Sequence, residues 1–135
     1  STQGVSSAAS DVYKRQHRDT PLAFAGDAQA RELVEQGIIL GWDRQLSSLQ
    51  RVFIYLVLEH AEDPLQQARS VQLFAELAEA ASAAERELFG GFLDYAVRHQ
   101  QVVQRFGRFP HRNEILGRVS SADELRFLAE PGSRF

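Results

Sequence analysis

Apolar residues along the chain recur at steps of three and four, the spacing that places side chains on one face of an α-helix. One such stripe consists of Leu49, Phe53, Leu56 and His60. The longest stripe has steps of four, three, four, three and four, and its members are Leu88, Phe92, Tyr95, His99, Val102 and Phe106. No strand-like alternation of useful length occurs. The pattern therefore predicts an all-α fold of antiparallel helical hairpins, a bundle of about five to six helices.

Polar capping signals indicate where these helices begin. Thr20-Pro21 and Asp63-Pro64 each place a capping side chain before a proline at the first helical position. Three further starts have the spacing of a capping box, at Ser47/Gln50, Ser82/Glu85 and Ser121/Glu124. The first predicted helix starts at Thr20-Pro21 and continues through residues 27–40. The other predicted helices cover residues 47–60, 63–81, 82–106, 111–116 and 121–129.

Glycine and proline interrupt the longest helix and the segment that follows it. Gly90-Gly91 lies inside that helix and predicts a kink or a close contact with another helix, because each glycine costs about 1 kcal/mol relative to alanine. Gly107 suits the left-handed cap that ends a helix. Pro110 and Gly117 bracket the short predicted helix.

The first residues differ from the rest of the chain. The segment Ser6–Gln16 contains the only lysine, Lys14, and resembles the translation of a transposase-type sequencing adapter. We therefore expect residues 1–16 to be a disordered, non-native tail. Residues 17–130 are expected to form a single helical domain, and residues 131–135 a second tail.

Composition narrows the class of protein. The net charge of -3 argues against a general nucleic-acid binder. The chain has no cysteine, which excludes a disulfide framework and a zinc–thiolate site and fits a cytoplasmic setting. Its longest apolar run, Val52–Leu58, is far shorter than the roughly 20 residues that span a bilayer. We therefore expect no nucleic-acid partner and no membrane partner.

Two histidines fall on the apolar stripes, so both should point inward. His60 and His99 each need a hydrogen-bond partner there. They are either satisfied core residues or part of a shared polar pocket, to which the neighbouring Glu59, Glu62 and Asp63 would contribute. Histidine and glutamate are possible zinc ligands, but the chain has no HExxH motif and no histidine pair at i, i+4. We predict no metal site and no cofactor.

Arginine is concentrated between Arg98 and Arg118, where five arginines accompany a single acidic residue, Glu114. Two interpretations remain open. In the first, Arg105, Arg108 and Arg112 pair internally with Glu59, Glu62 and Asp63 and lock the loop onto a neighbouring helix. In the second, the guanidinium groups hold an anionic ligand, and His111 donates or accepts a proton.

Two strings carry a family resemblance. "FIYLVLEHAED", followed by "RFGRFPHRNEILGRVSSADELRFL", is similar to the bacterial domain-of-unknown-function family 924. "RDTPLAFAGDAQA" resembles that family's middle segment, so the likeness runs from about residue 18 to 128. The resemblance implies an all-α, tetratricopeptide-like fold and no established activity. The matching polar positions are Glu59, His60, Glu62, Asp63, His99, Arg105, Arg108, His111, Arg112, Asn113 and Arg118.

The chain departs from that family in three places. Val57 stands where the family usually has proline, and Ala61 replaces a serine, which removes one hydroxyl from the candidate pocket. The family's N-terminal part, with a tryptophan-containing helix and a D-Q-F-P-R-N-like motif, has no counterpart before Arg18. We therefore expect this chain to be a fragment that lacks those helices.

Three functional hypotheses follow, and none assigns a reaction. The leading one is a bacterial helical domain whose polar Arg/His/Glu pocket organises the fold or binds a small anionic ligand. The second is an enzyme for a phosphorylated or carboxylated metabolite, in which Arg105, Arg108 and Arg112 hold the anion and His111 or His60 moves the proton. The third is a helical scaffold that binds a protein partner.

Overall fold

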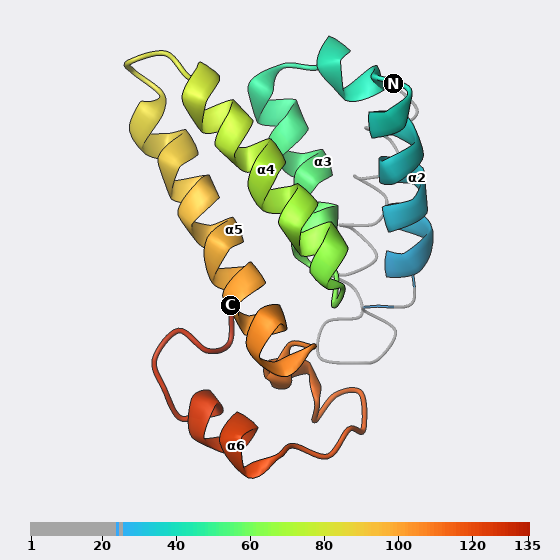
Figure 1. Cartoon of the computed structure of the whole chain (residues 1–135), viewed down its shortest axis with the longest axis vertical. Helices are drawn as coiled ribbons and strands as arrows, with labels where there is room; N and C mark the ends of the chain where they lie inside the picture. The colour runs from blue at the N-terminus through green and yellow to red at the C-terminus, as the bar shows by residue number, and fades with distance from the viewer. Residues whose placement is uncertain (1–23, 25) are drawn as a thin grey trace.

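The computed structural model describes residue 24 and residues 26–135, and all regular secondary structure in this part of the chain is helical (Figure 1). Its elements are α2 (Asp27–Ile39), η2 (Trp42–Gln45), α3 (Ser48–Glu59), α4 (Pro64–Ala80), α5 (Arg86–Phe106), η3 (Pro110–Arg112) and α6 (Ala122–Leu128). The prediction of an all-α fold is confirmed. The predicted tail over residues 1–16 and the start at Thr20-Pro21 lie outside the described residues.

Helices α2, α3, α4 and α5 lie side by side, and α4 packs most extensively, against α3 and α5 (Figure 1). The short α6 lies beyond the end of α5, and the last residues return toward α5 (Figure 1). Among the described residues, no helix is long and apolar enough to cross a lipid bilayer.

Two apolar clusters hold this arrangement together. The larger lies among α3, α4 and α5 and contains Tyr55, Leu58 and Phe74, each of which is almost completely buried. The smaller cluster lies at the C-terminal end of α5 and is centred on Val103 and Phe109. Full burial of one such side chain contributes about 1.5–3 kcal/mol, so these contacts fix the helices against one another.

Three of the predicted helix starts form as expected. Ser47 and Ser121 each make a complete capping box, with Gln50 and Glu124 respectively. Asp63 accepts hydrogen bonds from two backbone N–H groups at the start of α4. These caps depend only on neighbouring residues, which is why the sequence predicts them well.

The start predicted at Ser82 is wrong. The Glu85 N–H donates to the backbone carbonyl of Ser82 rather than to its hydroxyl, so residues 82–85 form a turn. Helix α5 therefore begins at Arg86, and Glu85 precedes it without a side-chain cap. Of the two alternatives expected at Gly90-Gly91, a kink or a close contact, the close contact is not seen, because a Cβ atom at either position would meet no atom of a neighbouring helix within 4 Å.

The segment after α5 folds as a tight loop rather than as the short helix predicted over 111–116. Gly107 and Gly117 both have positive φ angles, 73° and 68°, as a left-handed turn requires. Only Pro110–Arg112 is helical, and the Arg118 N–H then returns to the Asn113 carbonyl at 2.8 Å. This return bond closes the loop and ends any helical continuation.

Candidate functional site

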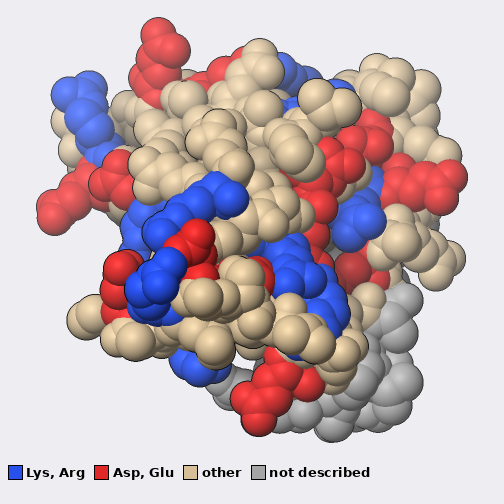
Figure 2. Space-filling view, turned by 60° about the horizontal axis from the view of Figure 1, so that its bottom comes forward, with Lys and Arg blue, Asp and Glu red and all other residues tan. Residues whose placement is uncertain are grey.

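The polar residues singled out by the sequence gather at the end of the bundle where the loop 107–120 crosses the turn between α3 and α4. A space-filling view of this end shows basic and acidic side chains interleaved rather than a patch of one sign (Figure 2). The loop is therefore not a uniformly positive surface. Its charges have to be considered pair by pair.

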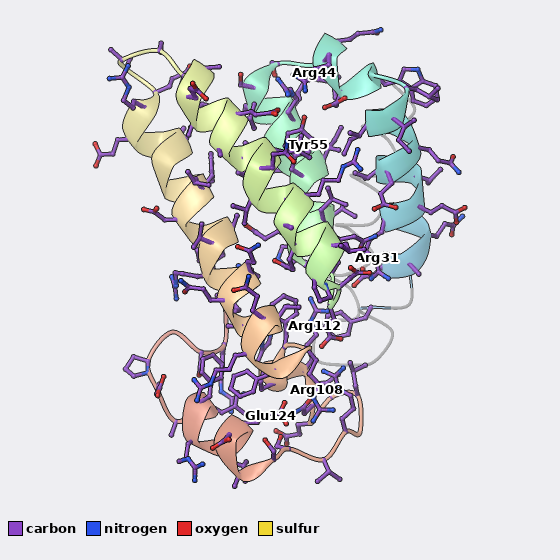
Figure 3. The ribbon with its side chains drawn as sticks, viewed as in Figure 1. Arg31, Arg44, Tyr55, Arg108, Arg112 and Glu124 are labelled. Atoms are coloured by element: carbon purple, nitrogen blue, oxygen red, sulfur yellow. The ribbon has the colours of Figure 1, made fainter. Side chains whose placement is uncertain are left out.

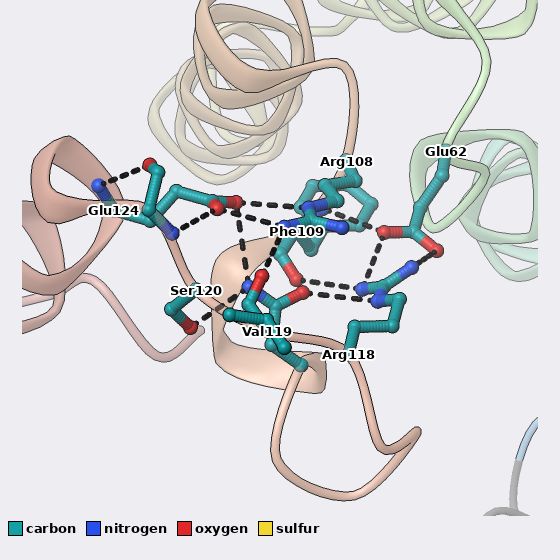
Figure 4. A network of polar contacts seen from close by, with 9 residues as sticks. Glu62, Arg108, Phe109, Arg118, Val119, Ser120 and Glu124 are labelled. Atoms are coloured by element: carbon teal, nitrogen blue, oxygen red, sulfur yellow. Dashed lines mark hydrogen bonds and ion pairs between the residues drawn. The ribbon is translucent and has the colours of Figure 1, made fainter.

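Glu62 is the first centre of this polar network (Figure 4). Both of its carboxylate oxygens accept hydrogen bonds from the Arg118 guanidinium, at 2.9 and 3.0 Å. The backbone N–H of Phe109 donates a third bond at 2.7 Å. Although burial acts to raise the pKa of Glu62, the bonds from Arg118 and Phe109 hold it below its usual value. Glu62 thereby joins the α3–α4 turn to the loop.

Glu124 is the second centre (Figure 4). Arg108 donates to its two oxygens, at 2.9 and 2.8 Å, and also to the Val119 carbonyl at 2.8 Å. The hydrogen bonds from Arg108 lower the pKa of Glu124 to about 2. The Asn113 side chain connects the two centres, because it donates to Glu124 at 3.3 Å and accepts from Arg118 at 2.9 Å.

Arg112 occupies a different position, near the lower ends of α4 and α5 (Figure 3). Its guanidinium stacks over Phe109 and donates to the His60 carbonyl at 2.8 Å. Its nearest carboxylate, Glu62, is 3.9 Å away. Burial lowers the pKa of Arg112, although the group remains charged at neutral pH.

The structure corrects the internal pairing predicted for the arginines. Arg108 pairs with Glu124, not with Glu59, Glu62 or Asp63, because the turn at Gly107 sends it toward α6 (Figure 3). Arg105 is exposed and lies over the rings of Phe106 and Phe127. Asp63 serves as the cap of α4. Of the predicted carboxylates, only Glu62 meets arginines of the loop: it forms an ion pair with Arg112 at 3.9 Å and accepts hydrogen bonds from Arg118.

Glu59, His60 and His99 form a separate cluster behind the network. Their ligand-type atoms all lie within 4.8 Å of one another. Glu59 and His99 are each 1% exposed, and the two imidazole rings meet edge to face with centroids 5.3 Å apart. Burial raises the pKa of Glu59 to about 8 and lowers the pKa of His99 to about 4, so both side chains are neutral at pH 7.

His111 lies beside a surface cleft of about 400 Å³, which is also lined by Arg118 and Arg134. Burial, followed by the charges of Arg112 and Arg134, lowers the pKa of His111 to about 4. An imidazole with such a pKa is a weak base at neutral pH, since general bases work best with a pKa near the working pH. The lowered pKa does not favour His111 as the catalytic base.

Both the sequence and the fold of this chain are similar to those of known proteins. Residues 10–132 match the family described as "Bacterial protein of unknown function (DUF924)". The chain belongs to this family. It is also similar to a solved structure described as a protein of unknown function, ATU0120, from Agrobacterium tumefaciens, with 38% identity and a TM-score of 0.69. That match covers 83% of this chain and 57% of the Agrobacterium chain. The sequence matches none of the curated proteins with which it was compared.

Two residues of this DUF924 chain belong to the site although sequence reasoning did not place them there. Glu124 was predicted only as part of a capping box. No local sequence signal indicates that it also accepts hydrogen bonds from Arg108. Phe135 lies in the segment predicted as a tail, yet its ring stacks on His99 with centroids 3.8 Å apart. Both contacts join residues that are distant in sequence, so helical periodicity and capping rules cannot predict them.

Proposed function

We propose that the arginine network of this DUF924 domain organises the fold and does not hold a substrate. The observation that supports this is the two-pronged pairing of Arg118 with Glu62 and of Arg108 with Glu124. In each pair, the fork of the guanidinium faces both carboxylate oxygens, the geometry in which an arginine binds a carboxylate most specifically. An incoming anion would have to displace an internal carboxylate from either arginine.

The network fastens three segments, and one of them, the α3–α4 turn, is far in sequence from the other two. Glu62 follows α3, the loop supplies Arg108 and Arg118, and Glu124 lies in α6. This closes the end of the bundle next to the cluster of Glu59, His60 and His99. The role of the network is thus to hold the loop and α6 over that buried cluster.

The enzyme hypothesis has less support from this geometry. It requires Arg105, Arg108 and Arg112 to converge on one anion, but Arg108 is engaged by Glu124 and Arg105 lies over aromatic rings. The scaffold hypothesis requires an apolar groove. Among the described residues, the groove of about 540 Å³ beside α4 is lined by Arg44, Arg69 and Glu76 as well as by apolar side chains.

One observation favours anion binding as a second candidate. Arg134 is exposed at the edge of the cleft that contains His111, and among the described residues it forms no ion pair. A phosphate or carboxylate group in that cleft would meet Arg134 without displacing Glu62 or Glu124. This candidate therefore predicts a ligand that depends on Arg134.

Thermal shift measurements separate the two candidates. Wild type and the Arg134→Ala and Arg118→Ala variants are heated with inorganic phosphate and a panel of phosphorylated and carboxylated metabolites. If the network only organises the fold, Arg118→Ala lowers the melting temperature and no anion raises that of the wild type. A ligand at about 100-fold excess over its Kd stabilises by about 2.7 kcal/mol. Such a shift, lost in Arg134→Ala, would establish anion binding instead.

A further inference from the structure

The buried cluster of Glu59, His60 and His99 has the composition of a metal site. We propose that these three residues ligate a divalent transition metal ion, with Zn²⁺ the ion that their side chains fit best. Zinc binds histidine nitrogen and carboxylate oxygen, and three protein ligands with an open fourth position are typical of its non-structural sites. The sequence predicted no metal because it shows neither an HExxH motif nor a histidine pair on one helix. Here the ligands come from α3, its C-cap and α5.

The distances are compatible with coordination after a small adjustment. The three ligand-type atoms lie within 4.8 Å of one another. Zn–N and Zn–O bonds of about 2.0–2.2 Å place tetrahedral ligand atoms about 3.3–3.5 Å apart. The longest of these separations, at most 4.8 Å, would have to shorten by up to about 1.3–1.5 Å for tetrahedral coordination.

Both imidazole rings have the orientation that metal binding requires. The Nδ1 atom of His60 lies 2.6 Å from the Leu56 carbonyl, and Nδ1 of His99 lies 2.8 Å from the Tyr95 carbonyl. A carbonyl oxygen only accepts, so in each ring Nδ1 carries the proton and the lone pair of the neutral ring is on Nε2. Metal-binding histidines commonly donate their other ring N–H to a carbonyl in this way.

Two buried polar atoms of the cluster lack a hydrogen-bond partner. Oε2 of Glu59 and Nε2 of His99 are both inaccessible to solvent and make no hydrogen bond. Buried polar atoms are nearly always satisfied, and an exception calls for an explanation such as an ion. One metal ion would satisfy both atoms at once. The half-buried His60 offers a route for the ion from solvent.

The surrounding charges bear on the affinity. Arg112 and Arg98 oppose a cation near His99, whereas Glu62 and an ionised Glu59 favour one. Arg112 donates to the His60 carbonyl and lies 3.9 Å from Glu62. The Phe135 ring covers one face of His99 and limits access of water.

Metal titration of the untagged full chain tests the proposal. After chelator treatment, Zn²⁺ is titrated in competition with a chromophoric chelator, and Co²⁺ is added separately to record its visible absorption. We expect one ion per chain and the intense bands of four-coordinate Co²⁺. The conservative variants Glu59→Gln and His99→Gln should each raise the Kd by at least about 10-fold, the smallest loss seen even for residues behind the ligands.

His111→Gln is the matched control, because it removes a neighbouring histidine that is not in the cluster. It should leave the Kd within a factor of about two. Absence of stoichiometric binding by the wild type would refute the proposal. Binding that is equally strong in Glu59→Gln and His99→Gln would refute it as well, since the ion would then lie elsewhere. Circular dichroism checks that each variant is folded. The titration of the wild type tests the proposal by itself, even if a variant does not fold.

Discussion

Replacement of Arg118 by alanine removes the guanidinium that joins the loop to the α3–α4 turn. The change deletes two bonds to Glu62, one to the Asn113 side chain and one to the Phe109 carbonyl. It also leaves the Glu62 carboxylate with the Phe109 N–H and the more distant Arg112 as partners. The variant therefore tests how much of the fold's stability depends on this pair.

The magnitude follows from the geometry and the exposure. Removal of one partner from a fully buried ion pair costs about 3–5 kcal/mol. The Arg118 and Glu62 side chains are 25% and 21% exposed, so water screens part of the interaction. We therefore expect Arg118→Ala to lower the free energy of unfolding by about 2–3 kcal/mol, with a coupling energy to Glu62→Gln of about 1–2 kcal/mol.

Urea denaturation of the wild type, the two single variants and the double variant gives that coupling energy. The exposed pair Arg126–Asp123, with side chains 70% and 65% exposed, is the control. Its coupling energy should be about 0–0.5 kcal/mol, as for other surface pairs. If the two pairs show equal coupling energies, the view that Glu62 and Arg118 organise the fold is refuted.

Three further predictions concern single contacts. Because Arg108 lowers the pKa of Glu124 to about 2, the unfolded state, with a pKa of about 4.3, takes up the proton first. This stabilisation is complete above pH of about 5 and is lost as the pH falls toward about 2, a dependence that Arg108→Ala should weaken in urea titrations at several pH values. Asp63→Ala removes the cap of α4 and should cost about 0.5–2 kcal/mol in unfolding free energy, whereas Asp63→Asn should retain most of it. Leu58→Ala, at a fully buried position, should cost about 2–5 kcal/mol by the same assay, and Leu65→Ala, at an 82% exposed position, almost nothing.

Predictions from the sequence were reliable where a structure depends on neighbouring residues. The caps at Ser47, Asp63 and Ser121 each satisfy backbone N–H groups two or three positions away, so the local pattern is sufficient. The same reasoning fails at Ser82, where the capping box spacing is present but the chain forms a turn. A serine hydroxyl and a serine carbonyl compete for the same N–H, and the direction in which the chain enters the helix decides between them.

The partners of the charged residues could not be predicted in the same way. Sequence reasoning placed Glu62 and the arginines in one cluster, and the structure brings Glu62 to Arg118 and Arg108 to Glu124. Any arginine fork fits any carboxylate, so residue type does not choose among pairs. The choice of partner follows from the path of the loop. That path is set by the turns at Gly107 and Gly117 together with the packing of the loop on the bundle.

The sequence by itself determined that the described chain is helical, where most of its helices begin, and that His60 and His99 face inward. These properties follow from apolar spacing and from caps, which are local. Only the tertiary structure decided that the two inward faces meet, and that Glu59 lies close to both His60 and His99. Whether His60 and His99 meet depends on how far α3 is shifted along α5. The side chains packed between the helices fix that shift, whereas the spacing of apolar residues along each helix does not.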